Sequence, residues 1–368
     1  MPGPTSFDKW FAQRVSFGAN RSASLADGTC PYLPARIGPP HPPPDLSPHL
    51  QWYAGTVQST RDTEMTPPAC VSEVHLQESP GKVNWPNFFV VGAQKAGTTY
   101  LYHTLKRHPE AFLPRQKELR YFQPGHQDSA SLDRYRALYA DATGYKAIGE
   151  ITPFYLFDPD VPARIRQVCP DAKIIIVLRD PIERAYSHYL DRRRDSDDRF
   201  DHAESFREAL RRYNDRSASE WRFSQEYIEH GFYYEQVRRY LETFGRDRVL
   251  ILLFDDLAKN SNELLMRVAR HIGVDPGFFA ELDVSQPRHP YAVPRFAATS
   301  WLQRQKIAKL RVVRSVGRAL RPILYDMKKP PMDEESLRQL QQLFEPDVTR
   351  LEELLGRKLP ELRKTWLQ

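Results

Sequence analysis

Residues 88–99 read FFVVGAQKAGTT and are the most informative stretch of this chain. The first four residues are all apolar, which is typical of a strand buried on both faces of a parallel sheet. Gly92–Gly97 then predicts a loop, and Thr98–Arg107 predicts a helix that ends at His108-Pro109. A strand, a loop of small residues and a helix in this order gather backbone N–H groups and the positive helix end around one point. The stretch therefore predicts a site for a phosphate or sulfate group.

Three further apolar segments predict strands, at Tyr145–Gly149, Lys173–Leu178 and Val249–Phe254. Helical segments separate them, and the pair Asp255-Asp256 is expected to cap the helix after the last strand. Strands that alternate with helices form right-handed βαβ units. We therefore expect one α/β domain with a central parallel sheet of about five strands, flanked by helices.

The C-terminal part predicts two consecutive helices. Asp333 is expected to be the N-cap of the first, whose apolar stripe contains Leu337, Leu340 and Phe344. Apolar residues from Val348 to Leu355 give a second stripe, and the glycine after them is expected to end that helix.

Residues 1–85 differ from the rest, because ten of the first fifty residues are proline. Such a composition favours extended or polyproline conformations over regular helix. We interpret residues 1–85 as an arm or linker, either docked on the domain or a plain extension, and residues 86–368 as the folded domain.

The loop differs from that of P-loop kinases. Those proteins have lysine and then serine or threonine directly after the last glycine, to reach the β- and γ-phosphates and to hold magnesium. Here Thr98 stands in the lysine position, and Lys95 lies three residues earlier, inside the loop. This order of residues favours an anion that lies closer to the loop than the β- and γ-phosphates of a kinase substrate do. Binding of such an anion requires no metal. A tight turn that binds nothing is the alternative.

A second anion anchor is predicted at residues 174–187, IIIVLRDPIERAYS. Arg179 follows a buried strand, at the edge of an open α/β sheet where ligands bind. Ser187 lies eight residues later, in a helix that Pro181 is well placed to begin. An arginine fork and a hydroxyl that converge on one anion form a phosphate clamp. If this segment is considered alone, the alternative is that Arg179 forms only an ordinary ion pair at the surface.

Composition sets the remaining limits. The net charge of +6 suits an anionic partner but is too small to indicate nucleic acid, which we do not expect. Three cysteines, Cys30, Cys70 and Cys169, suggest neither a disulfide framework nor a zinc site. The first twenty residues lack a signal-peptide core, and no apolar run is long enough to span a membrane. We therefore expect a cytoplasmic protein without a metal; its oligomeric state stays open.

The two anchors together resemble the 3′-phosphoadenosine-5′-phosphosulfate (PAPS)-dependent sulfotransferases of the heparan-sulfate and bacterial carbohydrate type, over about residues 86–368. The resemblance implies a P-loop-like sulfotransferase fold and PAPS as cosubstrate. It implies 3′-phosphate contacts at Arg179 and Ser187, and a nucleotide contact at Lys328 or Lys329, in the closing segment KKPPMD. The implied contacts of the 5′-phosphosulfate end are Gln94, Lys95, Ala96, Gly97, Thr98 and Thr99.

The resemblance also implies a base. The segment KELRYF at 117–122 is similar to the stretch that carries the catalytic glutamate of 3-O-sulfotransferases, which corresponds to Glu118. Arg120 stands where many relatives have histidine, and Ile151 stands where the heparan-sulfate enzymes have lysine. Glu150 is the reserve candidate, followed by His188. A solvated ion pair of Glu118 with a basic neighbour is the alternative.

We therefore expect in-line sulfuryl transfer from PAPS to a hydroxyl or amine, on a carbohydrate by preference, with Lys95 and Glu118 catalytic. Lys95 is expected to stabilise charge on the leaving phosphate. A lipid or secondary-metabolite acceptor, a P-loop kinase or NTPase, and a non-catalytic nucleotide-binding protein are the alternatives.

Overall fold

The structure is a computed structural model that describes residues 84–125, 129–194, 205–214, 227–282, 293–294, 325–326 and 329–366. The predicted arm at residues 1–85 lies outside these residues except for its last two, and so does Lys328. The predicted boundary at residue 86 stays a prediction.

The central sheet has five parallel strands, as expected. Four of them match the predicted strands to within about two residues, which is ordinary uncertainty at the ends of elements. The short edge strand was not predicted, because two residues carry no readable pattern. In spatial order the strands are β2 (Ala111–Phe112), β3 (Ala147–Ile151), β1 (Phe88–Gly92), β4 (Lys173–Leu178) and β5 (Val249–Leu253).

Strand β1 lies at the centre of the sheet, with β3 on one side and β4 on the other. Val90 pairs with Ile151, and Gly92 pairs with Ile176. The chain continues from β1 toward the β2 edge and later crosses to the β5 edge, so the strand order reverses beside β1. In open α/β sheets this reversal marks the place where ligands bind, outside the carboxyl ends of the strands.

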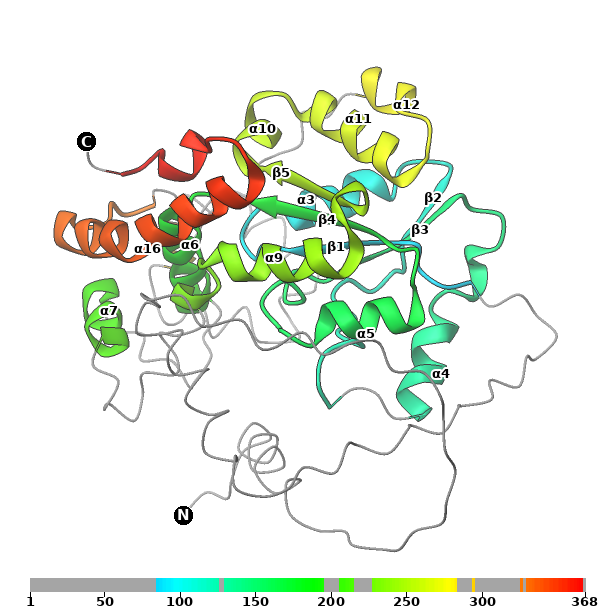
Figure 1. Ribbon diagram of the computed structural model, residues 1–368, viewed down its shortest axis with the longest axis horizontal. Coiled ribbons are helices and arrows are strands. Elements are labelled where there is room, and N and C mark those ends of the chain that lie inside the picture. The colour runs from blue at the N-terminus through cyan, green and yellow to red at the C-terminus, as the bar shows by residue number, and fades with distance from the viewer. Residues whose placement is uncertain are drawn as a thin grey trace, which may run out of the picture. The chain divides into compact units, whose positions relative to one another are not determined.

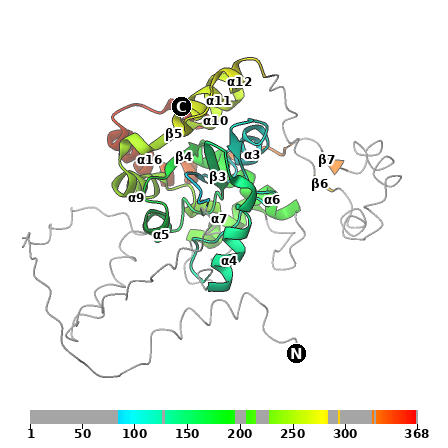
Figure 2. The same cartoon turned by 90° about the vertical axis from the view of Figure 1, so that its right-hand side faces the viewer.

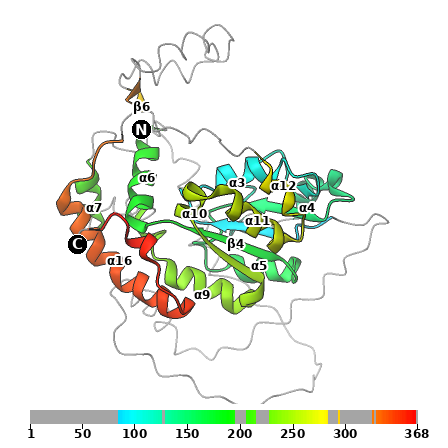
Figure 3. The same cartoon turned by 90° about the horizontal axis from the view of Figure 1, so that it is seen from above.

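Helices cover both faces of the sheet (Figures 1 and 3). One face carries α5 (Val161–Val168) and α9 (Tyr233–Phe244), and the other carries α3 (Thr98–Leu105) and α11 (Ser261–Ile272). Every residue of β1 is buried. Double coverage explains why β1 and β4 are continuous apolar runs without alternation.

Close packing explains one glycine of the sheet. A Cβ on Gly149 of β3 would lie 2.0 Å from the Phe88 ring on neighbouring β1. The shorter elements are α4 (Ser129–Ala137), α10 (Phe254–Lys259), α12 (Gly277–Ala280), β6 (Val293–Pro294), β7 (Tyr325–Asp326), and 3₁₀ turns at Ala140–Ala142, Arg246–Arg248 and Pro360–Arg363. Figure 2 shows β6 and β7 side by side, and they pair antiparallel.

A second apolar cluster joins α6 (Pro181–Arg194), α7 (Phe206–Asn214) and α16 (Glu334–Leu355). The prediction of two C-terminal helices was wrong, since α16 is continuous through Pro346. Proline removes one backbone donor from a helix. The following Asp347 turns outward from α16 and accepts the Tyr233 backbone N–H, at 2.6 Å, at the start of α9. Packing against α9 thus supports the helix across the proline.

The predicted caps have different outcomes. Asp333 is the N-cap of α16 and accepts the Ser336 backbone N–H at 3.0 Å, and Gly356 ends the helix in a left-handed conformation. Asp255 and Asp256 do not cap α10, because that helix begins at Phe254. They lie in its first turn, where carboxylates still favour the helix dipole.

Candidate active site

The loop after β1 has the shape of an anion cradle. Lys95 and Gly97 both have positive φ, 64° and 86°. The φ of Gly97 favours glycine there, and a Cβ at this position would also lie 2.6 Å from the end of the Leu257 side chain. Within the described part of the chain, the backbone N–H groups of Lys95, Gly97 and Thr98 donate to no other protein group. They lie at the start of α3, where the helix dipole also favours an anion.

The six loop residues fall into two sets. Lys95, Gly97 and Thr99 are partly exposed, whereas Gln94, Ala96 and Thr98 are buried. The Gln94 side chain points inward and accepts a 2.7 Å hydrogen bond from Nδ1 of His230, which fixes that proton on Nδ1. Burial holds the pKa of His230 well below its ordinary value, so the imidazole is neutral. Gln94 therefore anchors the loop through its side chain.

The structure brings the two predicted anchors together. Arg179 follows β4, and its Nη1 donates to the Lys95 carbonyl at 2.9 Å. Its Nη2 donates to Glu183 at 3.0 Å, and its buried Nε has no hydrogen-bond partner among the described residues. The guanidinium also lies 4.6 Å from the centre of the Phe254 ring. An arginine held by two hydrogen bonds, with other N–H groups of its guanidinium unused among the described residues, is suited to hold a phosphate oxygen.

One face of α6 lies toward the loop. Glu183, Ser187 and Asp191 are spaced four residues apart, so they share that face. Glu183 contacts Arg179, and Asp191 lies 2.8 Å from Lys95 Nζ. Ser187, between the two contacts, is partly exposed beside both anchors. Asp191 was not predicted from the sequence, although its position one turn beyond Ser187 is a signal that points to it.

Positive charge gathers behind Arg179. Lys329 lies 5.0 Å from the centre of the Tyr186 ring, and its pKa is lowered mainly by burial, with the charge of Arg179 also acting on it. Lys364, which the sequence analysis missed, hydrogen-bonds Asp255. The hydrogen bond to Asp255 raises the pKa of Lys364. The negative charge of Glu183 also raises this pKa, whereas the positive charge of Arg179 lowers it. Lys328 lies outside the described residues.

Glu118 lies at the carboxyl edge of the sheet. Its backbone N–H donates to the carbonyl of Ile151, the last residue of β3, at 3.2 Å. Its carboxylate contacts Lys117 at 2.5 Å and is about one third exposed. Since β3 neighbours β1, the carboxylate is on the edge where the anion loop begins. This is a position from which a base can meet an acceptor that enters from solvent.

The two reserve bases are enclosed in the protein. Glu150 is 2% exposed and accepts hydrogen bonds from Tyr135 Oη and Thr152 Oγ1 at 2.7 and 2.6 Å. Burial raises the pKa of Glu150. His188 is also buried, and burial lowers its pKa well below the ordinary value. Neither side chain reaches an entering acceptor in this conformation.

Among the described residues, no three His, Cys, Asp or Glu side chains are grouped so that they could bind a metal ion. No helix of that part of the chain is both long and apolar enough to cross a membrane. Cys169 is a free, buried thiol, and burial raises its pKa to about 12.

The fold and the site define an α/β protein with a P-loop-like turn after β1 and an arginine at the end of the adjacent strand β4 that contacts this turn. The sulfotransferase domain family matches residues 86–356, and the chain belongs to that family.

Curated relatives and a solved structure agree with this. The chain is 37% identical over 105 residues to the membrane-associated sulfotransferase kil1 of Dictyostelium discoideum, covering 28% of this chain and 22% of that one. It is 29% identical over 171 residues to human heparan sulfate glucosamine 3-O-sulfotransferase 3B1, covering 45% and 41%. The chain thus spans less than half of either relative. A crystal structure of a sulfotransferase from Alicyclobacillus acidocaldarius aligns with a TM-score of 0.56 and 29% identity, over 76% of this chain and 100% of that one.

Proposed function

We propose that this protein transfers a sulfuryl group from PAPS to an acceptor hydroxyl or amine, with carbohydrate as the preferred acceptor class. The hydrogen bond from Arg179 to the Lys95 carbonyl carries the proposal, because it joins two anion anchors in one site. A ligand with phosphate groups at two separate positions matches that arrangement. PAPS has a 5′-phosphosulfate for the loop and a 3′-phosphate for Arg179 and Ser187.

The loop binds the phosphosulfate through backbone N–H groups, the Thr98 and Thr99 residues and the Lys95 ammonium. The acceptor oxygen or nitrogen attacks sulfur while the bond from sulfur to the 5′-phosphate oxygen breaks in line. The leaving group is 3′-phosphoadenosine-5′-phosphate (PAP), and Lys95 stabilises the charge that develops on its oxygen. To do so, the ammonium turns from Asp191 toward the donor.

Glu118 takes the acceptor proton in this scheme. A base must lie within hydrogen-bond reach of the attacking group, and among the three glutamate and histidine candidates only Glu118 is on the exposed side of the sheet edge.

The similarity to a heparan sulfate 3-O-sulfotransferase supports a carbohydrate acceptor. The buried Ile151 in place of lysine weakens the case for a glycosaminoglycan in particular. A screen with sulfur-labelled PAPS tests the acceptor class directly. Label should pass to oligosaccharides with free hydroxyl or amino groups and much more slowly to phenols, sterols or fatty alcohols. Transfer only to the second group would replace the carbohydrate assignment with a lipid or metabolite acceptor.

Arg179→Ala tests the 3′-phosphate anchor. Removing a charge-assisted hydrogen bond costs about 1.5–3 kcal/mol, so affinity for PAP should fall roughly ten- to a hundredfold. Affinity for adenosine-5′-phosphate, which lacks the 3′-phosphate, should barely change. Isothermal calorimetry measures both. An equal loss for the two nucleotides would show that Arg179 only supports the loop through Lys95.

The matched control is Arg248→Ala. Arg248 forms an ion pair with Asp171 at the amino end of β5, whereas Arg179 lies at the carboxyl ends of the strands. Both nucleotide affinities should be unchanged in this variant. If it lowers PAP affinity as much as Arg179→Ala does, the effect is one of overall charge and the anchor is misassigned.

A further inference from the structure

The last described residues form a segment that extends beyond the part matched by the family. The match ends at residue 356, whereas the chain continues through a 3₁₀ turn at Pro360–Arg363 to Trp366. Leu359 and Leu362 are each 1% exposed, and Trp366 packs against both hydrophobic clusters. We call residues 359–366 the C-terminal segment. Its apolar side chains are part of the core.

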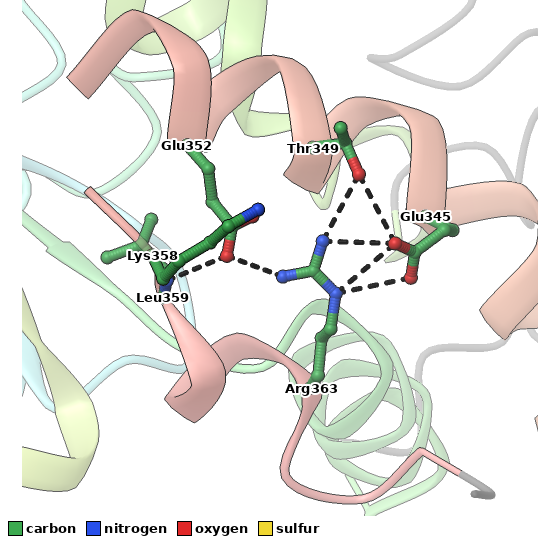
Figure 4. A network of polar contacts seen from close by, with 6 residues as sticks. All are labelled: Glu345, Thr349, Glu352, Lys358, Leu359 and Arg363. Atoms are coloured by element: carbon green, nitrogen blue, oxygen red, sulfur yellow. Dashed lines mark hydrogen bonds and ion pairs between the residues drawn. The ribbon is translucent and has the colours of Figure 1, made fainter. Parts of the chain in front are cut away.

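A polar network fixes the C-terminal segment on helix α16 (Figure 4). Arg363 donates to the carboxylates of Glu352, at 2.6 Å, and Glu345, at 3.0 Å, and to Thr349 Oγ1. Glu352 is buried and also accepts the Leu359 backbone N–H at 2.7 Å. A bidentate arginine between two carboxylates of one helix sets both position and direction of the segment.

The segment then reaches the 3′-phosphate anchor. The Thr365 backbone N–H and Oγ1 both donate to Asp180 Oδ2, at 3.0 and 2.7 Å. The other carboxylate oxygen of Asp180 accepts the backbone N–H groups of Ile182, at 2.9 Å, and Glu183, at 3.3 Å. Asp180 therefore caps the first turn of α6 while it is held from behind by Thr365. Arg179 is the adjacent residue, and Ser187 lies on the same helix.

A second contact fastens the segment to the same sheet edge. Lys364 Nζ donates to Asp255 Oδ2 at 2.9 Å, and Asp255 lies just after β5. Because β4 and β5 are neighbours in register, Lys364 and Thr365 hold the carboxyl ends of both strands. Packing of the segment would need the apolar contacts alone, whereas Thr365 adds two hydrogen bonds to Asp180, in the turn that carries Arg179.

We propose that the C-terminal segment is a positioning element for the 3′-phosphate anchor, with Thr365 orienting Asp180 and thereby Arg179 and Ser187 for a 3′-phosphorylated adenosine nucleotide. The proposal rests on the proposed PAPS-dependent function. Thr365 does not contact the nucleotide in this account. Loss of the Thr365 contact is therefore expected to lower the ratio of PAP affinity to adenosine-5′-phosphate affinity. A general loss of stability would not change this ratio.

The test compares Thr365→Val with Thr365→Ser and with a distant threonine. Valine keeps the shape of threonine but removes the hydroxyl, and serine restores the hydroxyl. Thr143 is the control, since its Oγ1 accepts a hydrogen bond from Asn84 near the amino end of β3, at the opposite sheet edge. Calorimetry measures PAP and adenosine-5′-phosphate for each variant, and thermal unfolding measures stability.

Thr365→Val should lower PAP affinity about three- to tenfold and leave adenosine-5′-phosphate affinity within about twofold. Thr365→Ser should return PAP affinity to near the unmutated value, and Thr143→Val should not change it. An unchanged ratio of the two affinities in Thr365→Val, whatever its melting temperature, would overturn the proposal. If the unmutated protein itself shows no preference for PAP, the proposed function fails, and that result is separate from the behaviour of the variants.

Discussion

Glu118→Gln is expected to lower turnover by about a hundred- to ten-thousandfold, the usual contribution of a general base. Glutamine keeps the size of the side chain but cannot take the acceptor proton. PAP affinity should stay nearly intact, because the carboxylate belongs to the acceptor side of the site. Single-turnover transfer from labelled PAPS measures the chemical step.

Glu150→Gln is the matched control for this assignment. Glu150 is buried between Tyr135 and Thr152, so its amide variant should alter stability more than the rate of the chemical step. Loss of transfer in Glu150→Gln with near-normal transfer in Glu118→Gln would transfer the role of base to Glu150. Asp191→Asn completes the comparison, because that carboxylate lies beside Lys95. If only Asp191→Asn abolishes transfer, the base is on α6.

Lys95→Ala has the second largest expected effect. Removing one group that stabilises the developing charge typically costs about a hundred- to a thousandfold in turnover. The Lys95 ammonium is in the anion loop, partly exposed and paired with Asp191, and in the proposed mechanism it leaves Asp191 to follow the charge as the bond to sulfur breaks. PAP affinity should fall much less than turnover, since the backbone N–H groups and Arg179 remain. The ratio of the two losses separates a catalytic role from simple binding.

Lys146→Ala serves as the control for Lys95→Ala. Lys146 is an exposed lysine paired with Glu110, next to the amino end of β3. Turnover should be unaffected there. A Lys95→Ala variant that loses PAP affinity and turnover in equal measure would contradict the catalytic role, because uniform binding would explain the whole effect.

Much of the fold was predictable because its strands are buried on both faces. The apolar runs of β1, β4 and β5 stand out from their surroundings, and the loop between Gly92 and Gly97 can be read only as a strand-to-helix turn. Strand β2 could not be predicted, since pairing with β3 rather than its own sequence makes it a strand. The continuity of α16 through Pro346 likewise depends on α9, which lies about a hundred residues earlier.

In the site, too, residues in local motifs were predictable, whereas residues brought in from distant parts of the chain were not. Lys95 and Arg179 belong to local motifs, and their spacing predicted that both would meet an anion. His230 and Thr365 have no motif and contribute only because the chain folds back onto Gln94 and Asp180. The roles in catalysis and binding stay predictions for every site residue, although the structure brings Lys95, Arg179 and Glu118 to the carboxyl ends of the strands. Ser187 lies on the helix beside them, and Lys329 packs on that helix.

Calorimetric titration with PAP, adenosine-5′-phosphate and ATP, first in excess chelator and then with magnesium, tests the central claim most directly. The account predicts metal-independent PAP binding that is at least about tenfold tighter than binding of adenosine-5′-phosphate, because only PAP places a phosphate on Arg179 and Ser187. ATP should bind weakly under the same conditions. Tight ATP binding that requires magnesium and shows no preference for a 3′-phosphate would contradict the account and favour a P-loop kinase or NTPase.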